Sequence, residues 1–390
     1  MGSLPIDVIS DILARLPVKY LLRSKSVCKS WFTLITSKHF INFHLRLNTL
    51  SSSDKLLLFS SSDHSLYSVT FDSLESPPTK LSYFSDNGPS FSGFGGSCNG
   101  LLLCFSNDNN NNDASNNDVY LVNPSTFQYR KIPKLKVPKS HVCVNYGFGY
   151  DHKTDDYKVI RIVILVYGCE DGPVFNAREV MVYSLKANSW RFIEEKISDY
   201  ATLASRNGAL VNNHLLHWMF WCISKKEHRI SSFNLCNEQW SEIPMPDYVE
   251  IGLDNHRKGL ECNGDYKKID VLHLGVLDER LCLLTRKVQN NMCDVGMWVM
   301  KEYGVKKSWV KLLNISDLNV SRSLKVVPIA YSERYSEILF RTEKELNVFR
   351  YDLKKKRTTR LEIPGLSNFD GVSACIRSIV PLICHGEIDA

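Results

Sequence analysis

Three short motifs contain the residue types that metal, phosphate and hydrolase sites use. The first, His214-x-x-His217 with Cys222 close behind, offers the nitrogen and sulfur ligands that zinc prefers. On a strand, however, residues i and i+3 point to opposite faces of the sheet, so these two histidines cannot converge on one ion. The motif therefore indicates the polar and aromatic positions of a β-hairpin and not a metal site.

The other two motifs resemble a phosphate-binding loop and the serine-lysine pair of some hydrolases. Residues 92–98 are rich in glycine, but the G-x-G-x-x-G pattern fails at Cys98 and no helix follows, so we expect a turn there. Ser26-x-x-Lys29 lies in an amphipathic segment and lacks the companion motifs. Paired carboxylates, as at 194–195, are adjacent on strands and point apart. We therefore expect no enzyme, no cofactor and no metal.

The composition is that of an ordinary globular protein. Of 390 residues, 44% are hydrophobic and 23% are charged, and 48 Lys and Arg against 42 Asp and Glu leave a net charge of +6. Because the excess is spread over the chain, the charge permits a nucleic acid or an anionic membrane as partner but does not demand one, and we expect neither nucleic acid nor membrane insertion. The densest basic run, Lys354–Arg357, is typical of a solvated hairpin turn, although a nuclear import signal stays open as an alternative.

Charges near the amino end and scattered cysteines favour a reducing compartment. Asp7, Asp11 and Arg15 interrupt the region in which a signal peptide needs an uncharged apolar core. The uncharged stretches 87–107 and 207–224 are broken by polar groups that are costly in hydrocarbon, so no membrane span is expected. The twelve cysteines contain no C-x-x-C pair, and most have apolar neighbours, which indicates reduced, buried thiols. We therefore expect the cytoplasm and the nucleus.

The first residues have helical periodicity. An apolar stripe over 8–16 ends at Pro17, a short second helix follows over 18–25, and a third stripe begins at Val27 and continues to Leu47. So small a unit cannot hide all of its apolar side chains from water. The sequence therefore predicts three helices in a domain that ends at Leu47, with apolar surface that needs a partner.

After a linker over 48–54, short strands replace the helical periodicity. They are rich in Val, Ile, Leu, Tyr and Trp and are separated by Asn, Asp, Gly, Ser and Pro. We therefore assign 1–47 to a helical domain and 55–385 to an all-β body. The predicted strands cover residues 55–59, 66–71, 101–105, 119–122, 157–166, 179–183, 209–211, 215–221, 230–233, 281–284, 295–300, 338–340 and 346–351.

A weak internal repeat organises these strands. Its unit is a strand, a polar turn and a second strand, and it recurs at steps of about 50 to 70 residues, beginning at Tyr120, Tyr183, Phe233, Tyr303 and Tyr351. A four-stranded propeller blade with loop insertions has this length. With a further unit near 55–84, the repeat predicts a β-propeller of about six blades, closed by a strand from Ala374 to Ile383.

The helical domain carries a motif that resembles an F-box. Tyr20 and Ser24 depart from the commonest residues of that family at their positions. The matching residues are Leu4-Pro5, Val8-Ile9, Ile12-Leu13, the run from Arg15 to Lys19, Leu21-Leu22-Arg23, the run from Val27 to Trp31, Leu34-Ile35 and Phe40.

The β body carries runs that resemble the F-box-associated interaction domain of plant F-box proteins. Within that family the chain is similar to the S-locus type and, more closely, to the constitutive-pathogenesis-response type that restrains immunity. The resemblance implies an α+β multidomain protein, with a three-helix F-box before a kelch-like propeller. The runs are Ser97 to Leu102, Asn123 to Thr126, Tyr146 to Asp151 with Asp155 to Val159, and Trp298 to Val305.

What the resemblance implies is a non-catalytic subunit of a Skp-cullin-F-box ubiquitin ligase. The F-box would bind the Skp adaptor and, through it, the cullin and RING subunits, and the propeller would capture a protein for ubiquitination and degradation. An intracellular immune receptor is the substrate that the resemblance suggests. The adaptor-binding residues that it indicates, some of which would instead hold the helices together, are Leu4, Pro5, Ile9, Ile12, Leu13, Leu16, Pro17, Leu21, Leu22, Val27, Cys28 and Trp31.

The substrate-binding residues stay undetermined, with loops at 146–151 and 254–266 as candidates. Two other functions also stay open. The propeller could be an enzyme or a glycan-binding protein whose helices only dimerise, which copurifying copper or turnover of sugars would favour. The chain could also hold the adaptor outside any ligase.

Overall fold

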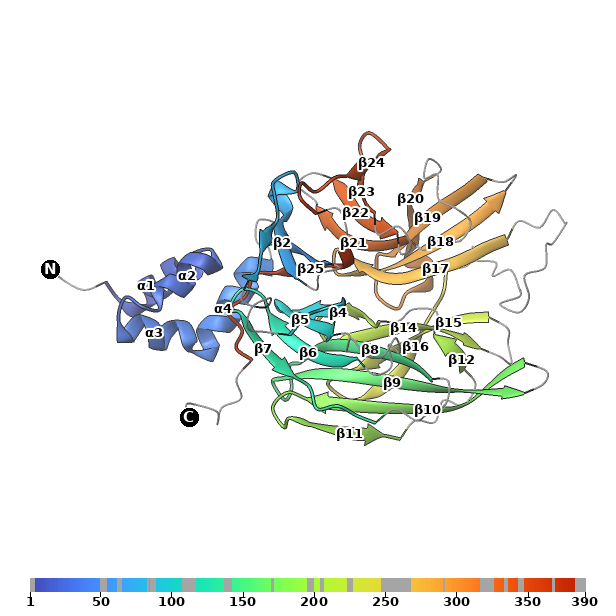
Figure 1. Cartoon of the computed structure of the whole chain (residues 1–390), viewed down its shortest axis with the longest axis horizontal. Coiled ribbons are helices and arrows are strands. Elements are labelled where there is room, and N and C mark those ends of the chain that lie inside the picture. Colours follow the sequence, from blue (N-terminus) through green and yellow to red (C-terminus); the bar gives the residue numbers. More distant parts are fainter. Residues whose placement is uncertain are drawn as a thin grey trace. The chain divides into compact units, whose positions relative to one another are not determined.

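The structure is a computed structural model. It describes residues 4–49, 55–61, 65–82, 84, 89–106, 117–136, 142–169, 172–194, 200–203, 207–222, 227–246, 268–289, 292–315, 326–332, 336–342, 347–366 and 369–382. The chain divides into two compact units, of which the first is Met1–Lys134 with Glu362–Ala390 and the second is Leu135–Leu361. The first unit thus combines both ends of the chain, and Figure 1 shows its helices in blue and its last strand in red.

Four helices open the first unit, where the sequence predicted three. The predicted third helix is divided at Ser37, whose backbone is extended, with φ −68° and ψ 141°. The Ser37 hydroxyl donates to the carbonyl of Leu34 and accepts from the amide of Phe40, so it ends one helix and caps the next. The helices are α1 (Ile6–Ala14), α2 (Val18–Ser24), α3 (Lys29–Thr36) and α4 (Lys38–Thr49).

The helices enclose a small apolar core that includes a residue from the far end of the chain. His44 is also buried, with its Nε2 3.3 Å from the carbonyl oxygen of Leu16. The last core member, Ile379, lies after the final strand, so the helical core is completed by the carboxyl-terminal segment. The buried core residues are Leu13, Ala14, Val18, Leu21, Ile35, Phe40 and Ile379.

Two antiparallel sheets of four strands complete the first unit. Blade 1 has the order β25-β1-β2-β3, with β1 (Lys55–Ser61), β2 (Leu66–Thr70), β3 (Thr79–Lys80) and β25 (Phe369–Ile376). Blade 2 has the order β4-β5-β6-β7, with β4 (Gly93–Cys98), β5 (Leu101–Ser106), β6 (Asp118–Asn123) and β7 (Gln128–Lys131). A short 3₁₀ helix, η2 (Phe71–Ser73), follows β2.

The closing strand is present, but the turn expected at 92–98 is wrong. Strand β25 pairs with β1, but it covers Phe369–Ile376 and not the predicted 374–383. Residues 93–98 form β4, because glycine there allows β5 to approach closely: a Cβ on Gly95 would lie 2.6 Å from Cδ2 of Leu103. Many glycines in a short run indicate a turn, and here they serve packing instead.

The second unit contains four more antiparallel sheets. Blade 3 has the order β11-β10-β9-β8, and blade 4 has β12-β14-β15-β16, with β13 also paired to β14. Their strands are β8 (Val142–Asp151), β9 (Asp156–Cys169), β10 (Gly172–Ser184), β11 (Ser189–Ile193), β12 (Tyr200–Leu203), β13 (Ala209–Val211), β14 (Leu215–Cys222), β15 (Glu227–Asn234) and β16 (Gln239–Ile243).

Blades 5 and 6 have the orders β17-β18-β19-β20 and β21-β22-β23-β24. Their strands are β17 (Lys268–Leu277), β18 (Arg280–Gln289), β19 (Met292–Met300), β20 (Trp309–Ile315), β21 (Val326–Ser332), β22 (Glu337–Thr342), β23 (Val348–Asp352) and β24 (Arg357–Leu361), and a 3₁₀ helix, η4 (Lys306–Ser308), precedes β20. The six sheets are the blades of a six-bladed β-propeller, which confirms the predicted fold class. In blades 2, 3, 4 and 6 the predicted repeat is the third and fourth strands, whereas in blade 5 its first residue, Tyr303, lies in the turn between β19 and β20.

Neighbouring blades of the second unit bury their apolar faces against each other. Ile160 and Val182 of blade 3 pack with Trp218 and Phe233 of blade 4. Blades 4 and 5 share a second apolar cluster, and blades 5 and 6 a third. The basic run at 354–357 lies at the turn between β23 and β24, as predicted: its first three residues lie in that turn, Arg357 begins β24, and all four are exposed.

Candidate functional site

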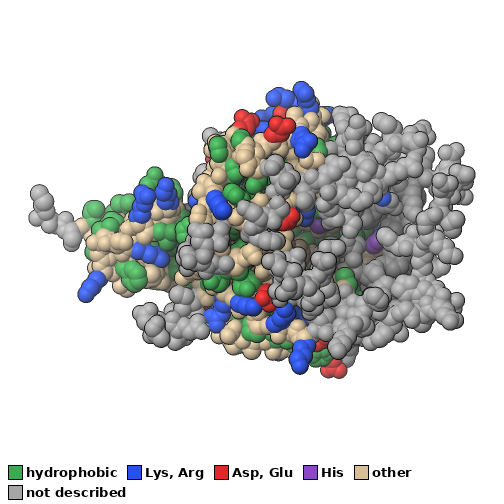
Figure 2. Space-filling model, viewed as in Figure 1, with side chains coloured by type: hydrophobic (Ala, Val, Ile, Leu, Met, Phe, Trp, Pro, Cys, Tyr) green, Lys and Arg blue, Asp and Glu red, His purple; other side chains and the backbone are tan. Residues whose placement is uncertain are grey.

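The large apolar side chains that water reaches are concentrated on the helices. Seven of the thirteen such residues in the described parts of the chain lie between Leu4 and Phe32, and Val27, at 63%, is the most exposed. Figure 2 shows hydrophobic side chains on the surface of the helices, among Lys and Arg. Exposed apolar patches on a folded domain mark interaction surfaces. We name these seven the apolar surface: Leu4, Ile6, Val8, Ile12, Tyr20, Val27 and Phe32.

The twelve predicted adaptor-binding residues divide into three groups. Leu13 and Leu21 are fully buried in the core, so they belong to the members that hold the helices together. The half-buried residues are Ile9, Leu16, Leu22 and Trp31, all packed against that core. The exposed residues are Leu4, Pro5, Ile12, Pro17, Val27 and Cys28.

Four members of the apolar surface were absent from the predicted set: Ile6, Val8, Tyr20 and Phe32. Val8 could have been found, because it lies four residues before Ile12 and therefore on the same face of α1. Helical spacing alone does not say which of two apolar faces is covered, and that choice depends on how the other helices pack.

After Asp11, the helices carry charge of one sign. Between Asp11 and Asp54 the sequence contains no Asp or Glu. Within that interval stand seven basic residues, most of them exposed and the rest half-buried: Arg15, Lys19, Arg23, Lys25, Lys29, Lys38 and Arg46. A partner that covers this region would meet a positive potential.

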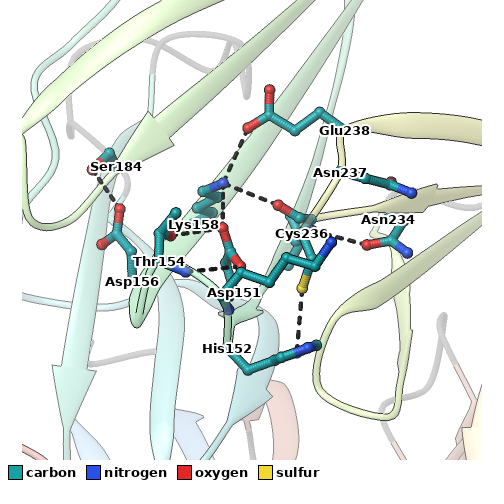
Figure 3. A network of polar contacts seen from close by, with 12 residues as sticks. Asp151, His152, Thr154, Asp156, Lys158, Ser184, Asn234, Cys236, Asn237 and Glu238 are labelled. Carbon is teal, nitrogen blue, oxygen red and sulfur yellow. Dashed lines mark hydrogen bonds and ion pairs between the residues drawn. The ribbon is translucent and has the colours of Figure 1, made fainter.

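A buried ion network joins blades 3 and 4 (Figure 3). Lys158 Nζ on β9 lies 2.8 Å from Asp151 Oδ2, 2.9 Å from the carbonyl oxygen of Leu235 and 3.0 Å from Glu238 Oε1. Asp151 is fully buried, and Arg191 also donates to Glu238. All three ammonium protons of Lys158 therefore have acceptors, two of them in the turn between β15 and β16.

The network stabilises the charged forms of Asp151, Lys158 and Glu238. Burial would raise the pKa of Asp151, but hydrogen bonds from Lys158, Thr154 and the amide of Lys153 together hold that pKa well below its usual range. Burial would lower the pKa of Lys158, and the two carboxylates raise it instead. The lysine thus stays an ammonium held as an ion pair, which is a structural link between two blades and not a proton-transfer group.

The loop expected at 146–151 is wrong, because these residues end strand β8. As in β4, glycine makes this strand resemble a loop in the sequence, although packing requires it. A Cβ on Gly147 would lie 2.6 Å from Cζ2 of Trp218 in blade 4. The other candidate substrate loop, 254–266, lies outside the described residues.

A cysteine-histidine pair lies next to the network without the properties of a nucleophile. Cys236 Sγ is 3.3 Å from His152 Nδ1. Burial, followed by the neighbouring Asp151, raises the pKa of Cys236, so the thiol stays protonated. In the parts of the chain that are described, no three metal-ligating side chains come together.

His217 links blade 4 to blade 5. It is buried, with Nδ1 3.0 Å from the carbonyl oxygen of Ala209 and Nε2 2.7 Å from the hydroxyl of Tyr303. Burial lowers the pKa of His217 to about 4. The other histidine of the motif, His214, has its Nδ1 2.6 Å from the carbonyl oxygen of Asn212 in the preceding turn.

Two further expectations from the sequence concern the cysteines and membrane-spanning segments. Among the residues whose side chains the structure describes, no cysteine forms a disulfide: Cys98, Cys104, Cys222, Cys282 and Cys375 are buried, and Cys28, Cys143 and Cys236 lie nearer the surface. Within the same residues, no helix has the length and hydropathy to cross a membrane.

Comparison with known proteins matches both regions of the chain. Residues 1–43 match the family model of the F-box domain, and residues 57–368 match that of the F-box associated beta propeller domain. The chain is similar to F-box protein CPR1 of Arabidopsis thaliana, with 30% identity over 100% of this chain and 91% of that protein. It is also similar to F-box protein At4g22390 of the same organism, with 29% identity over 99% of this chain and 92% of that protein.

Proposed function

Since this chain belongs to the F-box proteins that carry an F-box-associated β-propeller domain, we propose that it is the substrate receptor of a Skp-cullin-F-box ubiquitin ligase. In this proposal the helices bind the Skp adaptor, and through it the cullin and RING subunits. The propeller captures the protein that is ubiquitinated and then degraded.

The observation that carries the proposal is the apolar surface of the helices. Seven large apolar side chains are exposed to solvent in the helical region, although that region has a packed core of its own. Burial of apolar area drives association, and a few large side chains contribute most of the affinity of an interface. The exposed members of the predicted set, with Ile6, Val8, Tyr20 and Phe32, are the contacts that we propose for the adaptor.

The charge of the helices supports a partner that is acidic where it meets them. Exposed Lys19 and Lys29 flank the apolar surface, and no acidic residue follows Asp11 until Asp54. Opposite charge on the partner would speed association, and this contribution weakens as salt rises. Capture should therefore become slower in high salt, with a smaller effect on dissociation.

The chain acts by proximity in this proposal and supplies no reacting group. A ligase that holds substrate and activated ubiquitin together raises their effective concentration. The buried Lys158 network and the protonated Cys236 thiol agree with a structural body. We further propose an intracellular immune receptor as the substrate, and the cytoplasm and nucleus as the place of action.

The test is adaptor capture by surface variants that leave the core intact. Ile12→Asp with Val27→Asp places two carboxylates on the apolar surface, at positions 51% and 63% exposed. Capture of the purified Skp adaptor should fall about 100-fold or more, because two central apolar contacts become charged. The melting temperature should change little, since neither side chain belongs to the core.

Phe192→Asp is the matched control. Phe192 is 58% exposed on β11, so the substitution adds the same charge at a similar exposure on a blade. It should leave adaptor capture at the wild-type level. Unchanged capture by the helical variant, or an equal loss in the control, would refute the proposal. Ubiquitination of a copurified partner in a reconstituted reaction then tests the receptor role itself.

A further inference from the structure

The segment after the last strand is buried although it has no strand partner. Residues 377–382 follow β25 and belong to no helix or strand. Ser378, Ile379, Val380 and Leu382 are nevertheless almost completely buried. The backbone polar groups of a buried segment need partners from elsewhere in the chain.

Blade 2 supplies these partners through Asn123 at the end of β6. The amide Nδ2 of Asn123 donates to the carbonyl oxygens of Ser378, at 3.2 Å, and Val380, at 2.8 Å. The Oδ1 of the same side chain accepts from the amides of Ser125, at 2.9 Å, and Thr126, at 3.3 Å. One buried side chain thus shapes the turn between β6 and β7 and also holds the carboxyl-terminal segment.

Other residues of the same blade contact this segment. The amide of Ser378 donates to Ser125 Oγ at 3.2 Å, and the amide of Leu382 donates to Gln128 Oε1 at 3.4 Å. At Gly100, in the turn between β4 and β5, a Cβ would lie 2.2 Å from that of Ser378. The segment therefore lies directly against two turns of blade 2.

Between these anchors the segment inserts a side chain into the helices. Ile379 is 3% exposed and packs in one cluster with Leu13, Leu21 and Phe40. Its flanking residues, Ser378 and Val380, are the two whose carbonyls Asn123 holds. The same few residues therefore contact blade 2 through their backbone and the helical core through a side chain.

We propose that residues 377–382 are a clasp that fixes the F-box helices against blade 2. The helices are then attached to the blade at the carboxyl-terminal end of the chain as well as through the polypeptide that follows α4. That the clasp also fixes the orientation of the adaptor-binding surface rests on the proposed function; the clasp itself does not.

Corresponding turns of other blades separate the two roles of Asn123. Asn234 ends β15, and its Oδ1 accepts from the amide of Cys236 at 2.8 Å. Asp352 ends β23, and its Oδ1 accepts from the amides of Lys354 and Lys355. The turn therefore needs only a side-chain oxygen, which Asp also provides, whereas the clasp needs the amide nitrogen.

This difference defines the test. Asn123→Asp keeps an oxygen for the turn, removes both donors to the segment and places a carboxylate beside two carbonyl oxygens. Asn234→Asp makes the same change in blade 4 and is the matched control. Hydrogen exchange of the full-length chain, read by mass spectrometry, reports both the segment and the helices.

In Asn123→Asp, the amides of Ser378, Ile379, Val380 and Leu382 and those of α1 and α2 should exchange about 10-fold faster or more, because both anchoring hydrogen bonds are lost. Asn234→Asp should leave both regions at wild-type rates. Wild-type exchange in Asn123→Asp overturns the proposal, as does faster exchange in the segment alone with the helices unchanged.

Ile379→Ser gives an independent test that leaves Asn123 and its turn unaltered. The helices should exchange faster while β4 to β7 keep their protection, because only the insertion into the helical core is lost. Unchanged protection of the helices would overturn the clasp. Adaptor capture by the Ile12 and Val27 variant tests the ligase proposal separately, so the two proposals can fail independently.

Discussion

The F-box helices and blades 3 to 6 differ in how far they bury their apolar side chains and in how they pair their polar groups. The helices expose Leu4, Ile12 and Val27 to water and obtain part of their core from Ile379. The blades enclose their apolar side chains between neighbouring sheets and join those sheets by buried polar links at Lys158 and His217.

This difference separates a region with a concentration of exposed apolar side chains from one whose main apolar faces are enclosed between sheets. Apolar surface that stays exposed after a core has formed is evidence for a partner, because folding alone does not bury it. Lys158 and His217, the polar links at the blade junctions, have their partners within the chain. Changes to the helices should therefore affect binding, and changes to the junctions should affect stability.

The largest effect is expected at the junction of blades 3 and 4. Lys158→Met removes the cation from a site where Asp151 is fully buried, and leaving that carboxylate unpaired should lower the free energy of unfolding by about 3–5 kcal/mol. Denaturant unfolding measures this loss. Adding Asp151→Asn should recover part of it, because the unpaired charge is removed. Equal stabilities of the single variant and the wild type would show that the network is not a structural link.

The second-largest effect on stability is expected within the helices, where a buried residue and its exposed neighbour are compared. Leu13→Ala removes a side chain that is 2% exposed and should cost about 2–5 kcal/mol of unfolding free energy. Ile12→Ala changes a side chain that is half exposed and should cost about 0.5 kcal/mol or less. Thermal unfolding of both variants measures the difference. A similar loss at both positions would mean that the apolar surface is part of the core.

A smaller effect concerns pH at the junction of blades 4 and 5. Burial lowers the pKa of His217 to about 4 in the folded chain, below its usual value near 6.5, so the unfolded state binds the proton first. Stability from this group is complete above about pH 6.5 and falls as the pH falls toward 4. Between pH 7 and pH 5 the loss should be about 2 kcal/mol. His217→Gln should lack this part of the pH dependence, and an unaltered dependence would contradict the assignment.

The smallest effect is expected at an exposed ion pair on α1. Arg15 Nε lies 3.1 Å from Asp11 Oδ2, and both side chains are largely exposed. Such pairs are screened by solvent and contribute little. Asp11→Ala should therefore leave the melting temperature unchanged within error, and a clear decrease would show that this pair holds the helices together.

Much of the fold could be predicted because the periodicities are local. The repeat of strand, turn and strand corresponds to the third and fourth strands of blades 2, 3, 4 and 6, and residues 354–357 lie at a hairpin turn. The predictions failed where tertiary packing overrides local composition. Strands β4 and β8 contain glycines that a neighbouring strand or blade requires, as at Gly147 against Trp218, and those glycines resemble a loop in sequence.

The candidate site could be predicted only in part, for a similar reason. Helical spacing places Ile12 and Leu13 next to each other in one apolar stripe, and nothing in that stripe says which of them faces water. The helices pack so that Leu13 is buried and Ile12 is exposed. Tyr20 and Phe32 were missed because their exposure depends on the packing of all the helices.

The sequence by itself determined the kinds of element, the number of blades and the family, because these depend on spacings of a few residues and on a repeat. Only the tertiary structure decided which apolar side chains stay in water, which charges pair across blades, and that Asn123 holds Val380 from 257 residues away. No local pattern encodes a contact over that separation, because it exists only once the chain has folded and brought its two ends together.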